Sequence, residues 1–513
     1  MPQLLVPLAL ASLAVSAAAQ CEIQPLIASD HSSGDQLGAA VSVRGNDAVF
    51  GAPGVSAGRG AAYVFERTGK DWSEVIKLGA GDPNQGANFG HSVSLFSDRV
   101  LVGAPKHGGQ GAAYVFDNVG GVWTQSAKLA AADIQPGDRF GESVSLFADV
   151  AVVGALNAGP GAAYVFELVG GVWTEVDKLT GSGRFGASVS VSGDLLLVGE
   201  LGSSATSTGR AVLFRREASG WTQLQAIASP DALPGDAFGA SVEIDPPYAL
   251  VGAPGIPTEL GAAYVFEEDL GLWSFMQKLD ASDSADSNAF GTSVSMIGAG
   301  TQPAALVGDP QSGAYGAAYL YKLEEEWTQK ARHSVDLTSE FGSAVSLSGG
   351  SAIVGARLHG AGGFLANEGR GFAFTLVPQG ISEVEGIPAT LSNASGGFQF
   401  LFFDTCVGQA GNAYLLYGSA SGTSPGTTVG GLPMPLNPDT YYDQVLAGEV
   451  PSLFQTAGII RPTGSAEAIF FLEPGTLPVA LTGVTVHHAF LVFDLFTSEA
   501  LLVSDAIPLT LTP

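Results

Sequence analysis

A short phrase recurs along most of the chain and constrains its fold more than any other feature of the sequence. Its clearest copy contains Phe89–Ser94, Val102–Pro105, Gly111–Phe116 and Trp123. Aligned on the glycine that follows the phenylalanine, the copies recur about every 50 residues, a period typical of β-propellers and solenoids. The seven aligned glycines are Gly38, Gly90, Gly141, Gly186, Gly239, Gly291 and Gly342.

Each repeat is expected to contain four β-strands. The repeats are rich in Val, Tyr, Phe, Ser and Gly and show no sustained 3.6-residue periodicity, which excludes a helical solenoid. In the second copy we expect strands at Ser92–Phe96, Val100–Gly103, Ala112–Asp117 and Trp123–Leu129. The sequence therefore predicts an all-β protein.

The third strand of each repeat is apolar on both faces. In the second copy Ala112, Tyr114 and Phe116 point one way, whereas Ala113 and Val115 point the other. Both faces must then be covered, and a propeller blade stacked between two neighbours meets this requirement. Seven repeats therefore predict a seven-bladed β-propeller over residues 21–378.

The seventh repeat lacks a fourth strand, and the mature N-terminus is expected to supply one. Residues 22–30 resemble the end of a fourth strand, such as residues 223–229, and lead directly into the first repeat. Such a strand would close the ring and remove two exposed sheet edges. The six tryptophans all mark the start of a fourth strand, in repeats one to six: Trp72, Trp123, Trp173, Trp221, Trp273 and Trp327.

The pattern Phe-Gly, Gly-Ala-Pro, Gly-Ala-Ala-Tyr-Val-Phe resembles the FG-GAP repeats of the integrin α-subunit N-terminal propeller and of exported bacterial relatives. The first element is kept in six repeats, with Leu37 replacing Phe in the first. The Gly-Ala-Pro element is intact at Gly51, Gly103 and Gly252 and altered in the other four. The resemblance implies a seven-bladed propeller that binds other macromolecules and does not imply catalysis.

The calcium loops of that family are not carried over to this chain. The corresponding connections, such as Arg44–Asp47 and Phe96–Arg99, are hairpin turns that are too short to supply six or more oxygen ligands. A loop with Asp280, Asp283 and Asp286 offers a peripheral calcium site as an alternative, but we favour a solvated acidic loop. No cofactor and no metal are therefore expected.

Charge and composition favour an exported protein. The formal net charge is −28, which repels nucleic acid and anionic membranes, so no nucleic-acid partner is expected. Residues 1–20 combine an apolar run with Ala17–Ala19, the pattern of a cleaved signal peptide, although the segment has no Lys or Arg. Gln20 precedes Cys21, where a lipoprotein signal needs a small residue, so we favour secretion. No transmembrane segment is expected after cleavage.

A second domain is expected at residues 381–513, where the repeat stops. Strand-like segments such as Gly397–Asp404 and Ala413–Ser419 alternate with Gly- and Pro-rich turns, which favours a β-sandwich. This region resembles a C-terminal domain found on assorted exported bacterial proteins. The two cysteines, Cys21 and Cys406, either form a disulfide that joins the closing strand to this domain or remain free thiols.

Ligand-binding residues are expected in loops at one rim of the propeller, namely the connections between second and third strands and those that enter each repeat. Loops on a rigid scaffold carry most binding sites. The longest candidate loop is Arg357–Arg370, and 105–110 is a shorter one. The candidate ligand-binding residues are Lys106, His107, Arg357, His359, Phe364, Leu365, Asn367 and Glu368.

The sequence thus favours a secreted or cell-surface, non-catalytic binding or adhesion protein that recognises an extracellular protein or polysaccharide. One alternative is an extracellular hydrolase with a carboxylate in the central channel, where the first strands offer Glu142 and Glu243. Another is a structural component of a surface layer. The sequence does not indicate the ligand or the oligomeric state.

Overall fold

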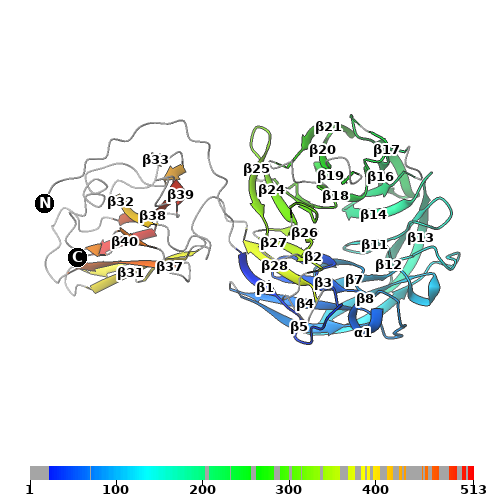
Figure 1. The fold of residues 1–513 in the computed structure, drawn as a ribbon, viewed down its shortest axis with the longest axis horizontal. Helices are drawn as coiled ribbons and strands as arrows, with labels where there is room; N and C mark the ends of the chain where they lie inside the picture. The colour runs from blue at the N-terminus through cyan, green and yellow to red at the C-terminus, as the bar shows by residue number, and fades with distance from the viewer. Residues whose placement is uncertain are drawn as a thin grey trace. The chain divides into compact units, whose positions relative to one another are not determined.

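Seven four-stranded antiparallel sheets form a ring in the computed structural model of this chain, so the seven-bladed propeller is confirmed (Figure 1). The structure describes residues 22–375 except 70, 203–206, 232, 256–260, 282–288, 300–302, 314, 336–338, 350 and 359–367. Beyond them it describes the backbone of the C-terminal strands. The chain divides into a propeller unit, Glu22–Leu376, and a unit that contains Val377–Pro513.

Each blade is built from four strands that follow one another from the propeller axis outward. Short helices occur in two connections, α1 (Val55–Gly58) and the 3-10 helix η1 (His107–Gly109). Blade 1 contains β2 (Ala40–Arg44), β3 (Asp47–Ala52), β4 (Ala61–Thr68) and β5 (Asp71–Leu78). Blade 2 contains β6 (Ser92–Phe96), β7 (Arg99–Ala104), β8 (Ala112–Val119) and β9 (Val122–Leu129). Blade 3 contains β10 (Val144–Phe147), β11 (Val150–Ala155), β12 (Ala162–Val169) and β13 (Val172–Thr180). 

The remaining blades repeat the same order of strands. In the seventh blade the fourth strand comes from the N-terminus. Blades 4 to 7 contain β14 (Phe185–Ser192), β15 (Leu195–Glu200), β16 (Arg210–Glu217), β17 (Gly220–Ile227); β18 (Ser241–Asp245), β19 (Tyr248–Ala253), β20 (Ala262–Asp269), β21 (Leu272–Leu279); β22 (Ser293–Ile297), β23 (Ala304–Asp309), β24 (Ala317–Leu323), β25 (Trp327–His333); and β26 (Phe341–Ser348), β27 (Ser351–Ala356), β28 (Arg370–Thr375), β1 (Glu22–Leu26).

The N-terminal strand β1 completes blade 7 by pairing antiparallel with β28 (Figure 1). The side-chain amide of Gln24 also joins β1 to the outer strand of blade 1. It donates a hydrogen bond to the carbonyl oxygen of Trp72 at 2.9 Å and accepts one from the Trp72 amide at 2.8 Å. Gln225 and Gln277 make the same reciprocal pair with the tryptophan of the following blade, so β1 is equivalent to the other outer strands.

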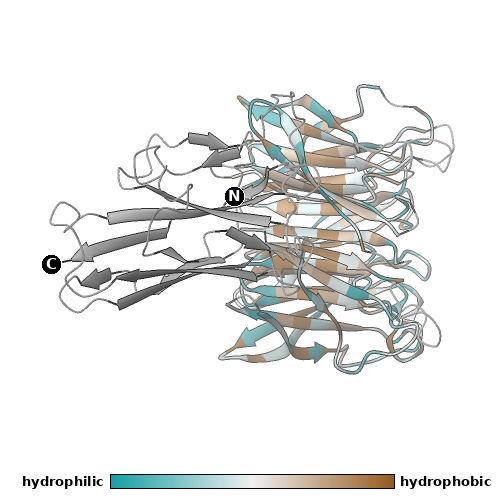
Figure 2. Ribbon diagram, turned by 60° about the vertical axis from the view of Figure 1, so that its left-hand side comes forward, coloured by the Kyte–Doolittle hydropathy of each residue, from teal (hydrophilic) through white to brown (hydrophobic). Residues whose placement is uncertain are grey.

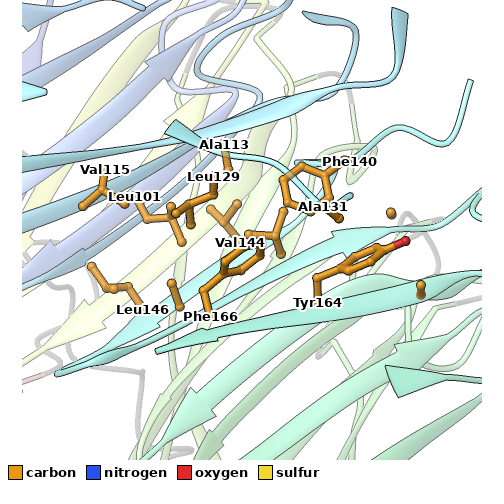
Figure 3. Packing of buried hydrophobic residues seen from close by; sticks show 14 of the residues in the cluster. Leu101, Ala113, Val115, Leu129, Ala131, Phe140, Val144, Leu146, Tyr164 and Phe166 are labelled. Carbon is orange, nitrogen blue, oxygen red and sulfur yellow. The ribbon is translucent and has the colours of Figure 1, made fainter. Parts of the chain in front are cut away.

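The hydrophobic core lies between the blades, as seven stacked layers of side chains. Figure 2 shows hydrophobic stretches in the strands of the propeller. Between blades 2 and 3, Ala113 and Val115 of β8 pack against Phe140 and Phe166 of blade 3 (Figure 3). The other face of β8, Ala112, Tyr114 and Phe116, packs against blade 1, as the alternation in the sequence predicts. Burial of both faces of each sheet supplies the main stabilisation of the ring.

The C-terminal unit contains two larger sheets and a hairpin of β33 and β34. One sheet has the order β29-β31-β37-β35, and the other has the order β30-β40-β38-β32-β36 with β39 paired to β38. A sandwich of the two sheets stays a prediction. The strands are β29 (Glu383–Ile387), β30 (Thr390–Ser392), β31 (Gly397–Asp404), β32 (Ala413–Ser419), β33 (Thr427–Val429), β34 (Leu432–Met434), β35 (Leu453–Phe454), β36 (Ala457–Ile459), β37 (Ser465–Leu472), β38 (Thr485–Phe493), β39 (Ala500–Val503) and β40 (Ile507–Thr512).

Candidate ligand-binding face

Two kinds of connection leave the propeller at one end, which we call the FG end. These are the connections between the second and third strands of a blade and those that enter the next blade, because strand direction alternates within each blade. The turns between first and second strands and between third and fourth strands leave at the opposite end. Lys106 and Arg357 lie at the FG end, whereas Arg44 lies at the opposite end.

The motif glycines hold neighbouring blades in close contact. A Cβ atom on Gly103 would lie 2.2 Å from the carbonyl oxygen of Gly141 in the next blade. The same clash recurs at every seam, with distances of 1.9 to 2.2 Å, including the seam from Gly355 of blade 7 to Gly38 of blade 1. Gly141 also has a φ of +93°, which residues with a side chain rarely adopt. Packing between blades therefore accounts for both glycines of the motif.

A tyrosine, an aspartate and a lysine form the same hydrogen-bonded triad in four blades. In blade 1, Tyr63 Oη donates to Asp30 Oδ1 at 2.7 Å and Lys77 Nζ donates to Asp30 Oδ2 at 2.6 Å. The aspartate lies in the connection that enters the blade, and the other two side chains lie in the third and fourth strands. Each triad therefore fixes an FG-end connection to its blade. The other triads are Tyr114–Asp82–Lys128, Tyr164–Asp133–Lys178 and Tyr264–Asp231–Lys278.

The triads are charged pairs with a neutral phenol. In blades 1, 3 and 5 the hydrogen bond from lysine is the main cause that lowers the pKa of the aspartate. In blade 2 burial opposes this effect, but the hydrogen bonds from Lys128 and Tyr114 outweigh it and lower the pKa of Asp82. Burial raises the pKa of all four tyrosines. The aspartates are thus ionised at neutral pH while the phenols keep their protons and donate.

The triads were not anticipated from the sequence, although a signal for them exists. In four repeats an aspartate lies four residues after the last apolar residue of the preceding fourth strand, as Asp82 follows Leu78. A lysine also precedes the final leucine of the fourth strand in each of these blades, as in Lys77–Leu78. Their partnership depends on the folded blade, because Asp30 lies in the connection that enters blade 1 and Lys77 lies 47 residues later in the fourth strand of that blade.

The candidate residues Lys106 and His107 lie side by side in sequence but in different environments. His107 is 8% exposed, and its Nδ1 lies 3.2 Å from Tyr114 Oη while its Nε2 lies 3.0 Å from Lys128 Nζ. Burial, together with the charge of Lys128, lowers the pKa of His107, so the ring is neutral at physiological pH. His107 therefore anchors the loop to the triad of blade 2, and the anchored loop presents Lys106 to solvent.

The candidate residues of the 357–370 loop also include one exposed and one buried side chain. Arg357 is exposed, and its Nε donates to Glu340 Oε2 at 2.5 Å. Glu368 is only 2% exposed, and its Oε2 lies 3.8 Å from His31 Nε2. The structure thus places Lys106 and Arg357 in solvent at the same end, on loops of blades 2 and 7. His359, Phe364, Leu365 and Asn367 lie outside the described residues.

The two candidate carboxylates have separate partners, and only Glu243 lies in a first strand, because Glu142 precedes β10. Glu142 Oε2 lies 2.8 Å from Arg139 Nη2, and its Oε1 lies 3.6 Å from His91 Nε2. Burial opposes ionisation of Glu142, but the contacts with His91 and Arg139 outweigh it and lower its pKa. Glu243 interacts instead with Ser190 and Asp245. The structure therefore shows no contact that would couple Glu142 and Glu243 as an acid and base pair.

The described residues contain neither a grouped set of metal-ligand side chains nor a membrane-spanning helix. There, no three His, Cys, Asp or Glu side chains are grouped so that they could hold a metal ion. Asp280 is described, whereas Asp283 and Asp286 are not, and Cys21 and Cys406 of the disulfide hypothesis also lie outside the described residues. Within the same part of the chain, no helix has both the length and the apolar character needed to span a membrane.

Five segments of the chain match the family model described as FG-GAP repeat, at residues 21–65, 72–116, 123–166, 221–266 and 273–321. Each segment begins at the fourth strand of one blade and ends in the third strand of the next. The unmatched stretches contain the inner three strands of blades 4 and 7, whose third-strand sequences, Gly209–Phe214 and Gly369–Phe374, depart from Gly-Ala-Ala-Tyr-Val-Phe.

No curated protein sequence matches the chain. FG-GAP repeats are typical of extracellular proteins, and FG-GAP propellers are typically non-catalytic. The five matches share one register with the blades, and the glycines of the motif form the contacts between blades in all seven seams. The chain therefore contains FG-GAP repeats and folds over them as a seven-bladed FG-GAP β-propeller.

Proposed function

We propose that this protein is secreted and acts at or outside the cell surface as a non-catalytic binding protein. Its ligand would be an extracellular protein or polysaccharide, recognised by loops at the FG end of the propeller. The family supports a binding role in an extracellular setting. The motif residues pack between blades, whereas the FG-end connections between them differ from blade to blade. This difference supports recognition of a ligand by the FG-end connections.

The loop that presents Lys106 carries this proposal. His107 is buried and bonded to Tyr114 and Lys128, and the backbone amide of Lys106 donates to the carbonyl oxygen of Ala87 at 3.2 Å. An ordered loop loses less conformational entropy when a ligand binds, which favours affinity. Lys106 is thus an exposed side chain on a loop whose backbone is fixed in advance.

A binding screen of the full chain against panels of extracellular proteins and polysaccharides tests the proposal. Ligands found in the screen would then be measured with the double variant Lys106→Ala and Arg357→Ala. We expect the Kd to rise at least tenfold for the double variant, because two exposed contacts at the FG end are lost. Arg44→Ala, at the opposite end, is the matched control and should leave the Kd unchanged.

Two results would overturn the proposal. One is an unchanged Kd in the double variant together with a raised Kd in Arg44→Ala, which would place recognition at the opposite end. The other is turnover of a panel polysaccharide, seen as newly released reducing ends, which would make the protein a hydrolase. Glu142→Gln and Glu243→Gln would then identify the carboxylate that is responsible.

A further inference from the structure

One position in the middle of the first strand is equivalent in all seven blades and lies around the propeller axis. Six blades have serine at this position, and blade 5 has Glu243. In each blade the residue is paired with the same position of the second strand, as Ser94 is with Leu101 and Glu243 is with Leu250. The seven residues are Ser42, Ser94, Ser145, Ser190, Glu243, Ser295 and Ser346.

Each serine of this ring joins two blades through its hydroxyl oxygen. Ser42 Oγ accepts a hydrogen bond at 3.0 Å from the amide of Leu95 in the next blade, and Ser94 Oγ accepts one at 3.0 Å from Leu146. These amides point away from their own sheet, where no further strand can pair with them, so the serine satisfies a group that is costly to leave unpaired. The other four bonds are Val191 to Ser145, Ile244 to Ser190, Leu347 to Ser295 and Val43 to Ser346.

The seam between blades 5 and 6 departs from this pattern. The equivalent amide of blade 6 belongs to Met296, and the equivalent side chain of blade 5 is Glu243 instead of a serine. Asp245, two residues further along the same strand face, accepts hydrogen bonds from the amides of Gly298 at 2.8 Å and Ala299 at 3.4 Å. Across this seam the Asp245 carboxylate therefore binds amides of blade 6, while Glu243 itself interacts with Ser190 of blade 4 and with Asp245.

No positive charge faces Glu243 from the strands packed against β18. Strands β14 and β22 contain no ionisable side chain, and β19 contains only Tyr248. Strand β15 contains Glu200, whose Oε1 is already bound by Arg210 Nε at 3.0 Å. Partial burial between the blades, with a smaller effect of the Asp245 charge, raises the pKa of Glu243 to about 8. The carboxyl group therefore keeps its proton at neutral pH.

We propose that Glu243 makes the packing of blade 5 against its two neighbours dependent on a proton. While the carboxyl group is protonated, it fills its place in the ring without a net charge. When it ionises, two carboxylates stand on the same strand with no cation to compensate them, and the packing of blade 5 against its neighbours weakens. The propeller would thus loosen around blade 5 as the medium becomes alkaline, while the contacts among the other blades remain intact.

The direction of the pH effect follows from the two pKa values of Glu243. The group titrates at 4.5 when it is unperturbed and at about 8 in the folded protein. Its contribution to stability is complete below pH 4.5, decreases as the pH rises toward 8, and is lost above that value. From pH 6 to pH 9 this one group should raise the unfolding equilibrium constant roughly 10- to 100-fold.

Chemical denaturation of the full chain between pH 5 and pH 9, followed by tryptophan fluorescence, tests the proposal. All six tryptophans lie in the propeller, so the signal reports on that unit alone. Glu243→Gln keeps the shape of the side chain but cannot ionise, and Glu243→Ser places a serine at this position in all seven blades. We expect both variants to lose the alkaline decrease in stability. Glu142→Gln, which changes an ion-paired carboxylate in the connection that enters blade 3, should keep the alkaline decrease of the unaltered protein.

Amide hydrogen exchange locates the effect within the ring. After correction for the intrinsic exchange rates, β18 and its neighbours β14 and β22 should lose protection between pH 6 and pH 9 in the unaltered protein, whereas β6 and β10 should not. The proposal is overturned if Glu243→Gln and Glu243→Ser keep the full alkaline decrease in stability. It is also overturned if protection is lost equally in all blades.

Discussion

The two glycines of each repeat determine how closely neighbouring blades approach. Gly103 lies against the carbonyl oxygen of Gly141, and each remaining pair repeats this contact. The second glycine also adopts positive φ, so two separate requirements select glycine at that position. The motif that identifies the family is thus explained by steric contact between backbones.

Substitution of Gly103 by alanine is expected to destabilise the propeller by about 3 kcal/mol, because the added methyl group meets a backbone oxygen that cannot move independently. Gly79→Ala is the matched control, since nothing lies within 4 Å of a Cβ atom there and no positive φ is required. Urea denaturation of the two variants measures the difference. Equal stability of Gly103→Ala and Gly79→Ala would contradict the steric role.

The triads make a second prediction at the residue scale. Tyr63→Phe keeps the buried ring and removes the hydrogen bond to Asp30, so we expect a loss of about 1 kcal/mol in the free energy of unfolding. Tyr315→Phe, at an exposed tyrosine, should change the stability by less than about 0.5 kcal/mol. Thermal denaturation compares the two variants. A Tyr63→Phe variant as stable as the unaltered protein would show that this hydrogen bond of the triad does not contribute to the free energy of unfolding.

Side-chain partnerships at this scale were only partly predictable from the sequence. The apolar faces of β8 follow from alternation along one strand, which is a local property. The burial of His107 depends on a tyrosine of the next strand and a lysine of the strand after it. The sequence shows Lys106 and His107 as two polar loop residues and gives no reason for them to face in opposite directions.

At the scale of the strands, the outer edges of the blades carry a common irregularity. In every blade the fourth strand has a β-bulge, for example at Val75 opposite Val64 and Phe65 in blade 1. In blade 7 the register of β1 shifts at Ile23, three residues before Leu26, just as Val75 precedes Leu78 by three. Bulges distort an exposed edge and discourage pairing with other chains, so each blade protects its outer strand in the same way.

The glutamines that join outer strands predict a matched pair of effects. Gln24→Ala and Gln277→Ala each remove two hydrogen bonds to a tryptophan backbone in the next blade. We expect each variant to lose about 1 to 2 kcal/mol of stability. Gln223→Ala, at an exposed position of β17, is the control and should have no measurable effect. A loss with Gln277→Ala but none with Gln24→Ala would indicate that β1 does not serve as an outer strand.

At the scale of the whole molecule, the fold was predictable because the same types of residue pack in the same way in every blade. The period of the glycines gives the number of blades, and the two apolar faces of each third strand require the blades to stack. The ring of Ser42 and its equivalents was not predictable in this way. Serine is common in such strands, and only the geometry of the seams shows that these hydroxyls accept amides across them.

The same scale explains why the sequence is more informative about the scaffold than about the ligand. Residues that hold the blades together recur in each repeat, so their role is visible from repetition. Residues that contact a ligand differ from loop to loop, and Lys106 and Arg357 have no equivalent that would identify them. The departures from the repeat, such as Glu243 in the ring of serines, therefore carry the information specific to this protein.

Amide hydrogen exchange of the N-terminal segment tests the closed seven-bladed ring most directly. If β1 completes blade 7, a peptide that covers residues 22–30 should be protected to the same degree as peptides that cover the outer strands β5 and β21. Exchange of residues 22–30 at the rate of an unstructured peptide, with β5 and β21 protected, would contradict the closed ring.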